Sequence, residues 1–136
     1  MNEMPGIKTW DEVMLRFKEI RFDEPFDLIV AIANGGIIPA ALLNQRLDVE
    51  MRLLKIRLRD ASQQPMYEAP RLLAPVDFDY KGKTVLLVDD RVKTGSTFQL
   101  ALRLLEGAKK IKTFAVNGKA DYALYNEPCF KFPWII

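Results

Sequence analysis

The chain of 136 residues contains no histidine and only one cysteine, Cys129. Without histidine, Ser-His triads, Cys-His pairs and histidine metal sites are excluded, so any catalysis must rely on carboxylates, lysine, hydroxyl groups, backbone amides or a bound ion. One cysteine cannot form an internal disulfide, and no apolar run is long enough for a membrane span or a signal peptide. We therefore expect a cytoplasmic protein with no membrane partner.

The chain also lacks a strong excess of charge of either sign. Its formal net charge of +2 is too small to indicate nucleic-acid binding by itself, so we expect no nucleic-acid partner. Hydrophobic residues make up 49% and charged residues 28% of the chain; both values are close to average usage, which argues against a disordered or fibrous class. The length suits one domain with a real core, and we expect residues 1–136 to form a single domain.

Segments with the patterns of helices and strands alternate along the chain. Apolar side chains recur at helical spacing over residues 9–20, and residues 27–33 form a continuous apolar run that predicts a strand buried on both faces. Further helices are predicted from 37 to about 46 and from about 96 to 106, and further strands at 50–58, 84–88 and 111–116. Residues 60–75 carry no periodicity and predict a long loop. The alternation favours an α/β fold with a mostly parallel sheet flanked by helices.

Two of the predicted strands run directly into a turn of small residues and then into a helix, and ligands gather at this edge of a parallel sheet. The first turn contains Asn34 and Gly35. The second consists of four consecutive residues, Thr94, Gly95, Ser96 and Thr97. Its backbone amides and hydroxyl groups at a helix N-terminus suit a phosphate, although such residues also cap helices that bind nothing.

Two adjacent carboxylates, Asp89 and Asp90, end the strand that leads to the second turn. Such groups repel each other and are costly to desolvate, so a bound cation or the hydroxyl groups of a ligand would explain them; simple exposure to solvent is the alternative. Neither a Walker A nor a GxGxxG pattern is present. The nucleotide-binding classes that those patterns define are therefore disfavoured.

Residues 85–97, VLLVDDRVKTGST, resemble the signature of the type I phosphoribosyltransferases, which bind 5-phosphoribosyl-1-pyrophosphate. Residues 32–40, IANGGIIPA, are similar to the pyrophosphate loop of that family, and residues 69–83, APRLLAPVDFDYKGK, to the approach from its mobile loop. The ending FKFPWII resembles the FPW segment of bacterial and archaeal enzymes that use xanthine, guanine or hypoxanthine. The resemblance covers residues 27–134 and implies the fold of this family with a minimal C-terminal hood.

By this resemblance the protein is an enzyme that transfers a phosphoribosyl group to a nitrogenous base of the purine type, with magnesium, and releases pyrophosphate. Asp89 and Asp90 would hold the ribose hydroxyl groups and the magnesium sphere, and Thr94–Thr97 the 5-phosphate. The amides of Asn34 and Gly35 would hold the pyrophosphate, in a loop that often contains a non-proline cis peptide in this family. Residues 60–72 would form a lid over the ligand, and a homodimer is implied.

Two positions depart from the family pattern. Asn34 stands where many relatives have Lys or Arg, so one cation for the pyrophosphate is missing; Arg57 or Arg59 could replace it, or could belong to a solvated strand edge. Lys93 stands where purine enzymes usually have an aspartate that hydrogen-bonds the purine N7. An ammonium group has donors only and cannot accept that hydrogen bond.

These departures leave the acceptor base open. Lys93 would pair with Asp90, with a ligand phosphate or with an acidic group of an unusual substrate, unless it points into solvent. Lys119 matches the lysine that contacts the exocyclic oxygen of a purine, although a solvated lysine is the alternative. Phe130, or Cys129 by a different alignment, takes the place of the base-stacking aromatic, with a plain hydrophobic plug as the alternative for Phe130. A non-catalytic or regulatory protein of the same fold, which binds a nucleotide or phosphoribosyl pyrophosphate, is the alternative to the enzyme.

Overall fold

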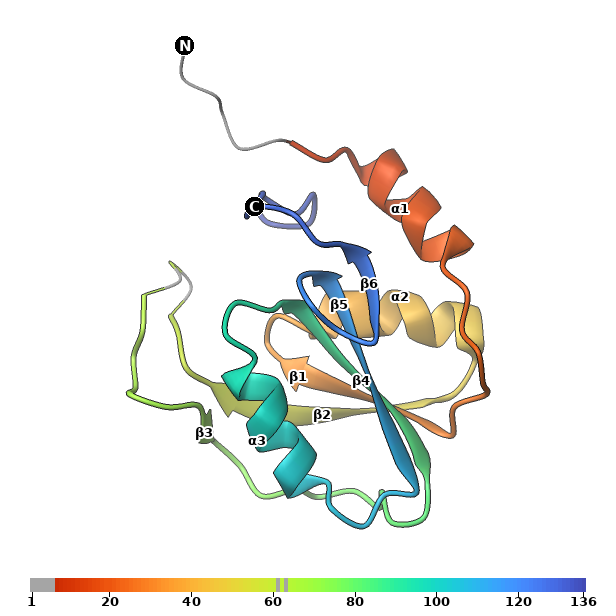
Figure 1. Ribbon diagram of the computed structural model, residues 1–136, viewed down its shortest axis with the longest axis vertical. Helices are drawn as coiled ribbons and strands as arrows, with labels where there is room; N and C mark the ends of the chain where they lie inside the picture. The colour runs from red at the N-terminus through yellow and green to blue at the C-terminus, as the bar shows by residue number, and fades with distance from the viewer. Residues whose placement is uncertain (1–6, 61, 63) are drawn as a thin grey trace.

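The computed structural model describes residues 7–60, 62 and 64–136, and six strands of this part of the chain form one sheet in the order β3-β2-β1-β4-β5-β6 (Figure 1). The elements along the chain are α1 (Trp10–Glu19), β1 (Leu28–Ala33), α2 (Ile37–Leu47), β2 (Glu50–Arg57), β3 (Arg71–Leu72), β4 (Thr84–Arg91), α3 (Ser96–Leu104), β5 (Lys110–Asn117) and β6 (Tyr122–Tyr125). None of the helices described is both long and apolar enough to cross a membrane.

Five strands of the sheet run parallel to one another, and β3 pairs with β2 in the antiparallel direction. The predicted α/β class with a mostly parallel sheet is therefore confirmed. The two short strands, β3 and β6, were not predicted, and α3 ends earlier than the apolar spacing indicated. Because neighbouring parallel strands end at the same edge, the turns that follow β1 and β4 lie side by side there.

Both faces of the sheet are covered, because all six residues of β1 are buried. Its alternate residues enter two separate cores. Ile29 and Ala31 pack on the side of α1 and α2, whereas Leu28, Val30 and Ile32 pack on the side of α3. Figure 1 shows α2 and α3 on opposite faces of the sheet and α1 beside β6 and the C-terminal segment. The helices thus leave the carboxyl ends of β1 and β4 accessible from one end of the sheet.

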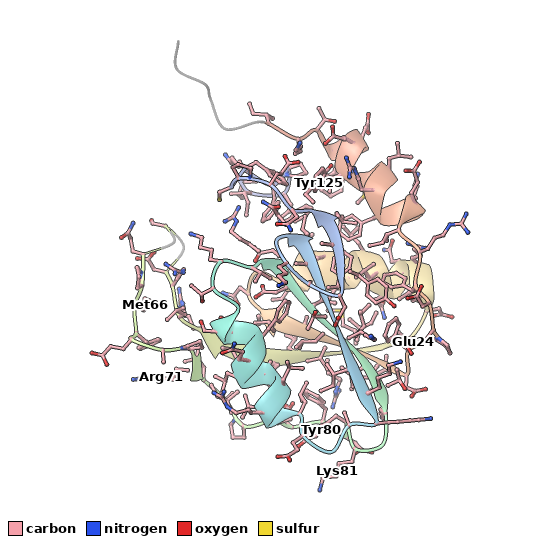
Figure 2. All side chains as sticks on the ribbon, in the orientation of Figure 1. Glu24, Met66, Arg71, Tyr80, Lys81 and Tyr125 are labelled. Carbon is pink, nitrogen blue, oxygen red and sulfur yellow. The ribbon has the colours of Figure 1, made fainter. Side chains whose placement is uncertain are left out.

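The segment after β6, residues 126–136, forms the hood that was expected, and α1 holds it in place. Trp134 stacks on Phe132 with ring centroids 5.1 Å apart, and its ring lies 6.5 Å from that of Phe17 in α1. Tyr125 donates a 2.7 Å hydrogen bond to Glu12 of α1 (Figure 2). Burial of this phenol, together with its hydrogen bond to Glu12, raises the pKa of Tyr125 to about 12, so it remains a donor at neutral pH.

The predicted loop at 60–75 is partly ordered into the sheet. Met66 donates its amide to Leu58 O at 2.6 Å, and Arg71 pairs with Arg57 across the β2–β3 ladder. Figure 2 shows Met66 and Arg71 along the outer edge of the molecule, beyond β2. Residues 61 and 63, which belong to the predicted lid, lie outside the described residues. Part of the expected irregular loop is therefore an antiparallel extension of β2.

Candidate active site

A cavity of about 620 Å³ lies at the carboxyl ends of β1, β2 and β4. Its size is that of a site for a small ligand. Most of the side chains predicted from the sequence line it: Asn34, Gly35, Arg57, Asp89, Asp90, Lys93, Thr94, Gly95, Ser96 and Thr97. The last residues of the hood, Trp134–Ile136, also contribute to its lining. The fold therefore brings the two predicted turns and the acid pair to one cavity.

The acid pair is electrostatically strained in the absence of a ligand. Burial, followed by the neighbouring charge of Asp90, raises the pKa of the Asp89 carboxyl well above its ordinary value. Asp89 keeps some exposed surface at the cavity, but the surrounding protein excludes enough water to penalise its ionised form. Its Oδ1 accepts the amide hydrogen of Asp90 at 2.8 Å, which fixes the two carboxyl groups relative to each other. Cations or hydroxyl donors of a ligand would relieve this repulsion.

The turn after β1 packs directly against β4. A Cβ added at Gly35 would lie 2.6 Å from Asp90 Oδ1, and one added at Gly36 would lie 2.4 Å from Val88 O. The first contact places the carboxyl of Asp90 against the backbone of the turn, and the second joins the turn to the strand. The peptide bond between Ala33 and Asn34 is cis, as the family resemblance implied. Neither glycine leaves room for a side chain.

The turn after β4 presents backbone amides and hydroxyl groups at the N-terminus of α3. Gly95, the residue before the helix, has φ +84°, a conformation that strongly favours glycine. Thr94 Oγ1 lies 3.0 Å from Ser96 Oγ and accepts the Ser96 amide hydrogen at 3.3 Å. The first amides of a helix have no partner within the helix, and the helix dipole favours an anion there. This turn has the donors that a phosphate requires.

Three cations from the end of β2 and the residues after it line the first cavity: Lys55, Arg57 and Arg59. Arg57 donates from Nε to Arg59 O at 3.3 Å. Lys55 was not predicted, although it alternates with Arg57 and Arg59 along the strand and could have been found by that spacing. It stands opposite Ala33 in the β1–β2 register, beside the turn that contains Asn34. Lys55 can therefore supply the positive charge that Asn34 lacks.

A second cavity of about 350 Å³ shares residues 91–95 with the first. It is lined by Lys93 and Lys119, two of the predicted site residues, and by Asn117, which the sequence did not single out. The side chain of Asn117 donates to Glu127 O and accepts from Glu127 N, both at 3.0 Å. This amide pair fixes the first turn of the hood over the cavity.

Lys93 is exposed and lines both cavities. The expected ion pair with Asp90 is not present among the described residues, whose ion pairs involve other groups. The side chain thus stands between the acid pair and the second cavity without a carboxylate partner. A ligand phosphate or an acidic group of a substrate stays a proposal for its partner.

Of the two interpretations of Phe130, the base-stacking residue was wrong and the hydrophobic plug is confirmed. Its side chain is 3% exposed, packs against Tyr125 and Phe132, and lines neither of the two cavities. Cys129, the other residue considered for this place, lines the second cavity. Phe130 is buried because alternate residues of the hood, Phe130 and Phe132, join the core of α1 and α2.

The acid pair fits magnesium that arrives with a ligand. Asp89 and Asp90 line the cavity, and the described residues contain no group of three or more carboxylate, cysteine or histidine side chains that could hold a metal by themselves. Magnesium in proteins often uses one or two carboxylates together with water and phosphate oxygens of a substrate. Two strained carboxylates beside a turn whose donors suit a phosphate are therefore a suitable donor set.

Comparisons with known proteins agree with this geometry. Residues 11–132 match the family model of the phosphoribosyl transferase domain. A purine phosphoribosyltransferase from Pyrococcus horikoshii Ot3 has a similar crystal structure, with a TM-score of 0.75 and 28% identity over 94% of this chain and 92% of that one. A xanthine-guanine phosphoribosyltransferase from Nitratidesulfovibrio vulgaris is 28% identical over 79% of this chain and 66% of its own length.

The family also contains relatives with other names. A ribose-phosphate pyrophosphokinase from Thermococcus kodakarensis is 54% identical over 93 residues, which are 67% of this chain and 31% of that enzyme. The chain thus spans less than two thirds of the length of each of these two curated relatives. Similarity within the shared domain therefore does not identify the acceptor.

Proposed function

This chain belongs to the phosphoribosyl transferase domain family, and from that premise we propose that it transfers the phosphoribosyl group of 5-phosphoribosyl-1-pyrophosphate to a nitrogenous base of the purine type. Pyrophosphate is the second product. Relatives named xanthine-guanine and purine phosphoribosyltransferases support the reaction class. These relatives do not identify the base, which depends on the residues of the second cavity.

One observation carries the proposal: the acid pair and the two turns line a single cavity. The turn at Thr94–Thr97 supplies amides and hydroxyl groups for the 5-phosphate, and Asp89 and Asp90 lie next to it for the ribose. The turn at Asn34–Gly35, with Lys55 and Arg57 beside it, faces the same space and suits the pyrophosphate. These three sets of groups correspond to the phosphate, the ribose and the pyrophosphate of the donor.

The carboxylates also suit the chemistry. When the bond between the ribose carbon and the pyrophosphate oxygen breaks, the electron pair leaves with pyrophosphate and positive charge develops on the ribose. Fixed negative charge on Asp89 and Asp90 favours this charge distribution over that of the ground state. The Asn34–Gly35 amides and the cations of β2 would hold the leaving group. Lys93 and Lys119 would orient the base from the second cavity.

Magnesium, when bound, would neutralise charge on the pyrophosphate oxygens, and Asp89 and Asp90 are the residues that would hold its sphere. Asp89 supports this assignment, because burial and repulsion from Asp90 raise its pKa and a nearby cation would lower it again.

The test is turnover by the purified chain. Pyrophosphate release is measured with magnesium, phosphoribosyl pyrophosphate and, in turn, xanthine, guanine and hypoxanthine. The double variant Asp89→Asn/Asp90→Asn removes two charges with little change in volume, and we expect it to lose most of the activity. Each lost charge-assisted contact should cost about 1.5–3 kcal/mol, roughly 10- to 150-fold in rate for each contact.

The control is Asp77→Asn/Glu106→Gln. It makes the same change in net charge at two exposed positions that do not line either cavity. This variant should keep wild-type turnover, and thermal melting of both double variants separates lost activity from lost fold. Equal turnover by wild type and the acid-pair variant would show that the acids have no part in the reaction.

Lys93 favours a second candidate, a regulatory protein that binds phosphoribosyl pyrophosphate or a nucleotide without turnover. Lys93 lines both cavities and cannot act as the proton acceptor found in related purine enzymes. The two functions differ in one result. Tight, magnesium-dependent binding of phosphoribosyl pyrophosphate without pyrophosphate release in the presence of any base would favour the regulatory protein.

A homodimer and a cytoplasmic location are further proposals that rest on the family resemblance. Light scattering on the purified chain measures the mass in solution and would distinguish a dimer from a monomer of 15.6 kDa.

A further inference from the structure

Most of the charged side chains that line the second cavity are cations. Arg91, Lys93 and Lys119 contribute cations, and Glu127 is the only carboxylate among the described residues that line it. The Glu127 carboxylate lies 2.7 Å from Lys8 Nζ, an ion pair that offsets its charge. The wall of this cavity therefore has an excess of positive charge.

Two of these cations are available to a ligand. Arg91 already donates from Nη2 to Phe130 O at 2.9 Å, and its guanidinium lies 4.5 Å from the centre of the Phe132 ring. Lys93 and Lys119 are exposed, and neither takes part in the ion pairs of the residues described. A molecule in the second cavity thus meets two ammonium groups without carboxylate partners.

Apart from the free thiol of Cys129, the side chains that line the second cavity offer little to accept a proton from a base. The side-chain oxygen of Asn117 accepts the Glu127 amide hydrogen, and the Glu127 carboxylate is held by Lys8. A protonated lysine cannot accept a proton. This lining therefore offers few acceptors for the ring proton that a neutral base must lose before or during transfer.

We propose that the second cavity selects nitrogen heterocycles that bind as anions, with Lys93 and Lys119 donating to the negatively charged ring or its substituents. This inference rests on the proposed function and names its class of acceptor. A base deprotonated at the reacting nitrogen forms the bond to the ribose carbon with its lone pair and has no proton to lose there. The bond from that carbon to the pyrophosphate oxygen breaks, pyrophosphate takes the electron pair, and no proton passes to the protein. A base whose charge lies on a ring carboxylate or on another nitrogen still carries that proton, which passes to water.

The negative charge can have two sources, an acidic ring N–H or a carboxylate on the ring, and matched nucleotides distinguish them. Xanthosine and inosine 5′-monophosphates share the ribose phosphate, but only the xanthine ring ionises near neutral pH. Orotidine and uridine 5′-monophosphates differ by one carboxylate. Calorimetry slightly above neutral pH measures the four affinities for the wild-type chain, and the tighter pair identifies the source of the charge.

We expect the anionic member of at least one pair to bind about tenfold more tightly than its neutral partner. Lys93→Gln and Lys119→Gln should each reduce that ratio several-fold, because each weakens binding of the anionic member more than binding of the neutral one. A structural role for either lysine would instead lower both affinities together. The ratio of the two affinities therefore distinguishes a lysine that recognises the charge of the ligand from one that only stabilises the cavity.

Lys109→Gln is the matched control. Lys109 precedes β5, whereas the second cavity lies beyond its other end, and the Lys109 amide donates to Lys83 O at 2.9 Å. Figure 2 shows the neighbouring Lys81 at the end of the molecule opposite Tyr125. This variant should keep the wild-type ratio in both pairs.

Ratios near one in both pairs, or a ratio that neither lysine variant changes, would overturn the inference. Such a result leaves the proposed function intact, because all four nucleotides carry the same ribose phosphate and would still bind. If none of the four nucleotides binds, the assignment of the phosphate to the turn after β4 is contradicted, and the inference is contradicted as well.

Discussion

The adjacent glycines after β1 allow one substitution to be tested at two positions with different expected results. At Gly36, an added Cβ would lie 2.4 Å from Val88 O and 2.8 Å from Ile32 O, which are backbone atoms of β4 and β1. Its φ of −81° is open to any residue, so the cost of Gly36→Ala comes from these contacts and not from the backbone conformation. At Gly35, the added Cβ would instead lie 2.6–2.8 Å from the carboxyl group of Asp90.

The expected effects of the two substitutions differ because the atoms that the new Cβ would contact differ in how easily they can move. Strand backbone cannot move without disturbing the sheet, so Gly36→Ala should cost about 1–3 kcal/mol of stability. For a domain of this size each kcal/mol lowers the melting temperature by about 3–5 °C. A carboxyl group can rotate, so Gly35→Ala should cost less stability but displace Asp90. Loss of one charge-assisted contact of about 1.5–3 kcal/mol weakens ligand binding roughly 10- to 150-fold.

Thermal melting and calorimetry with phosphoribosyl pyrophosphate and magnesium measure the two effects. Gly36→Ala should show the larger fall in melting temperature, and Gly35→Ala the larger loss of affinity relative to its fall in melting temperature. Wild-type affinity in the Gly35→Ala variant would refute the placement of Asp90 at the ligand.

Three further predictions follow from the same site. Because burial and Asp90 raise the pKa of Asp89, the ionised carboxyl penalises folding increasingly as the pH rises above its ordinary pKa of 3.8. Asp89→Asn should therefore raise the melting temperature at neutral pH, and this gain should shrink as the pH falls toward 3.8. A pH-independent gain would contradict the assigned cause. Lys55→Gln should weaken pyrophosphate binding about tenfold while Lys109→Gln does not, and equal effects of the two would remove Lys55 from the site. The Glu127 amide donates to the side-chain oxygen of Asn117 at 3.0 Å, so Asn117→Ala should speed hydrogen exchange at that amide. Unchanged exchange would mean that the hood is held without Asn117.

The parallel sheet and both ligand turns could be predicted from the sequence because each depends on local pattern. The six buried residues of β1 form an uninterrupted apolar run. The turn that follows β1 contains the glycines that close packing requires, and the turn that follows β4 contains a glycine with positive φ. The strand β3 could not be predicted in this way. It has two residues, and its pairing with Arg57 and Ile56 depends on the path of the loop between them.

The contribution of the C-terminal hood to the site could not be predicted from local sequence pattern either. Cys129 and Phe130 are neighbours, and the sequence alone did not decide which of them lines the second cavity. That choice depends on the packing of Phe130 against Tyr125 and Phe132 beneath α1. Asn117 was missed for a similar reason, because its two hydrogen bonds to Glu127 join residues that only the fold brings together.

The central claim is that Thr94–Thr97 holds the 5-phosphate of a phosphoribosyl ligand beside Asp89 and Asp90. A crystal structure of the chain with a nucleoside 5′-monophosphate tests it most directly. The phosphate should lie at the N-terminus of α3, within hydrogen-bond distance of the Ser96 and Thr97 amides, with the ribose hydroxyl groups toward the acid pair. A nucleotide bound with its phosphate at any other place on the protein would contradict the claim.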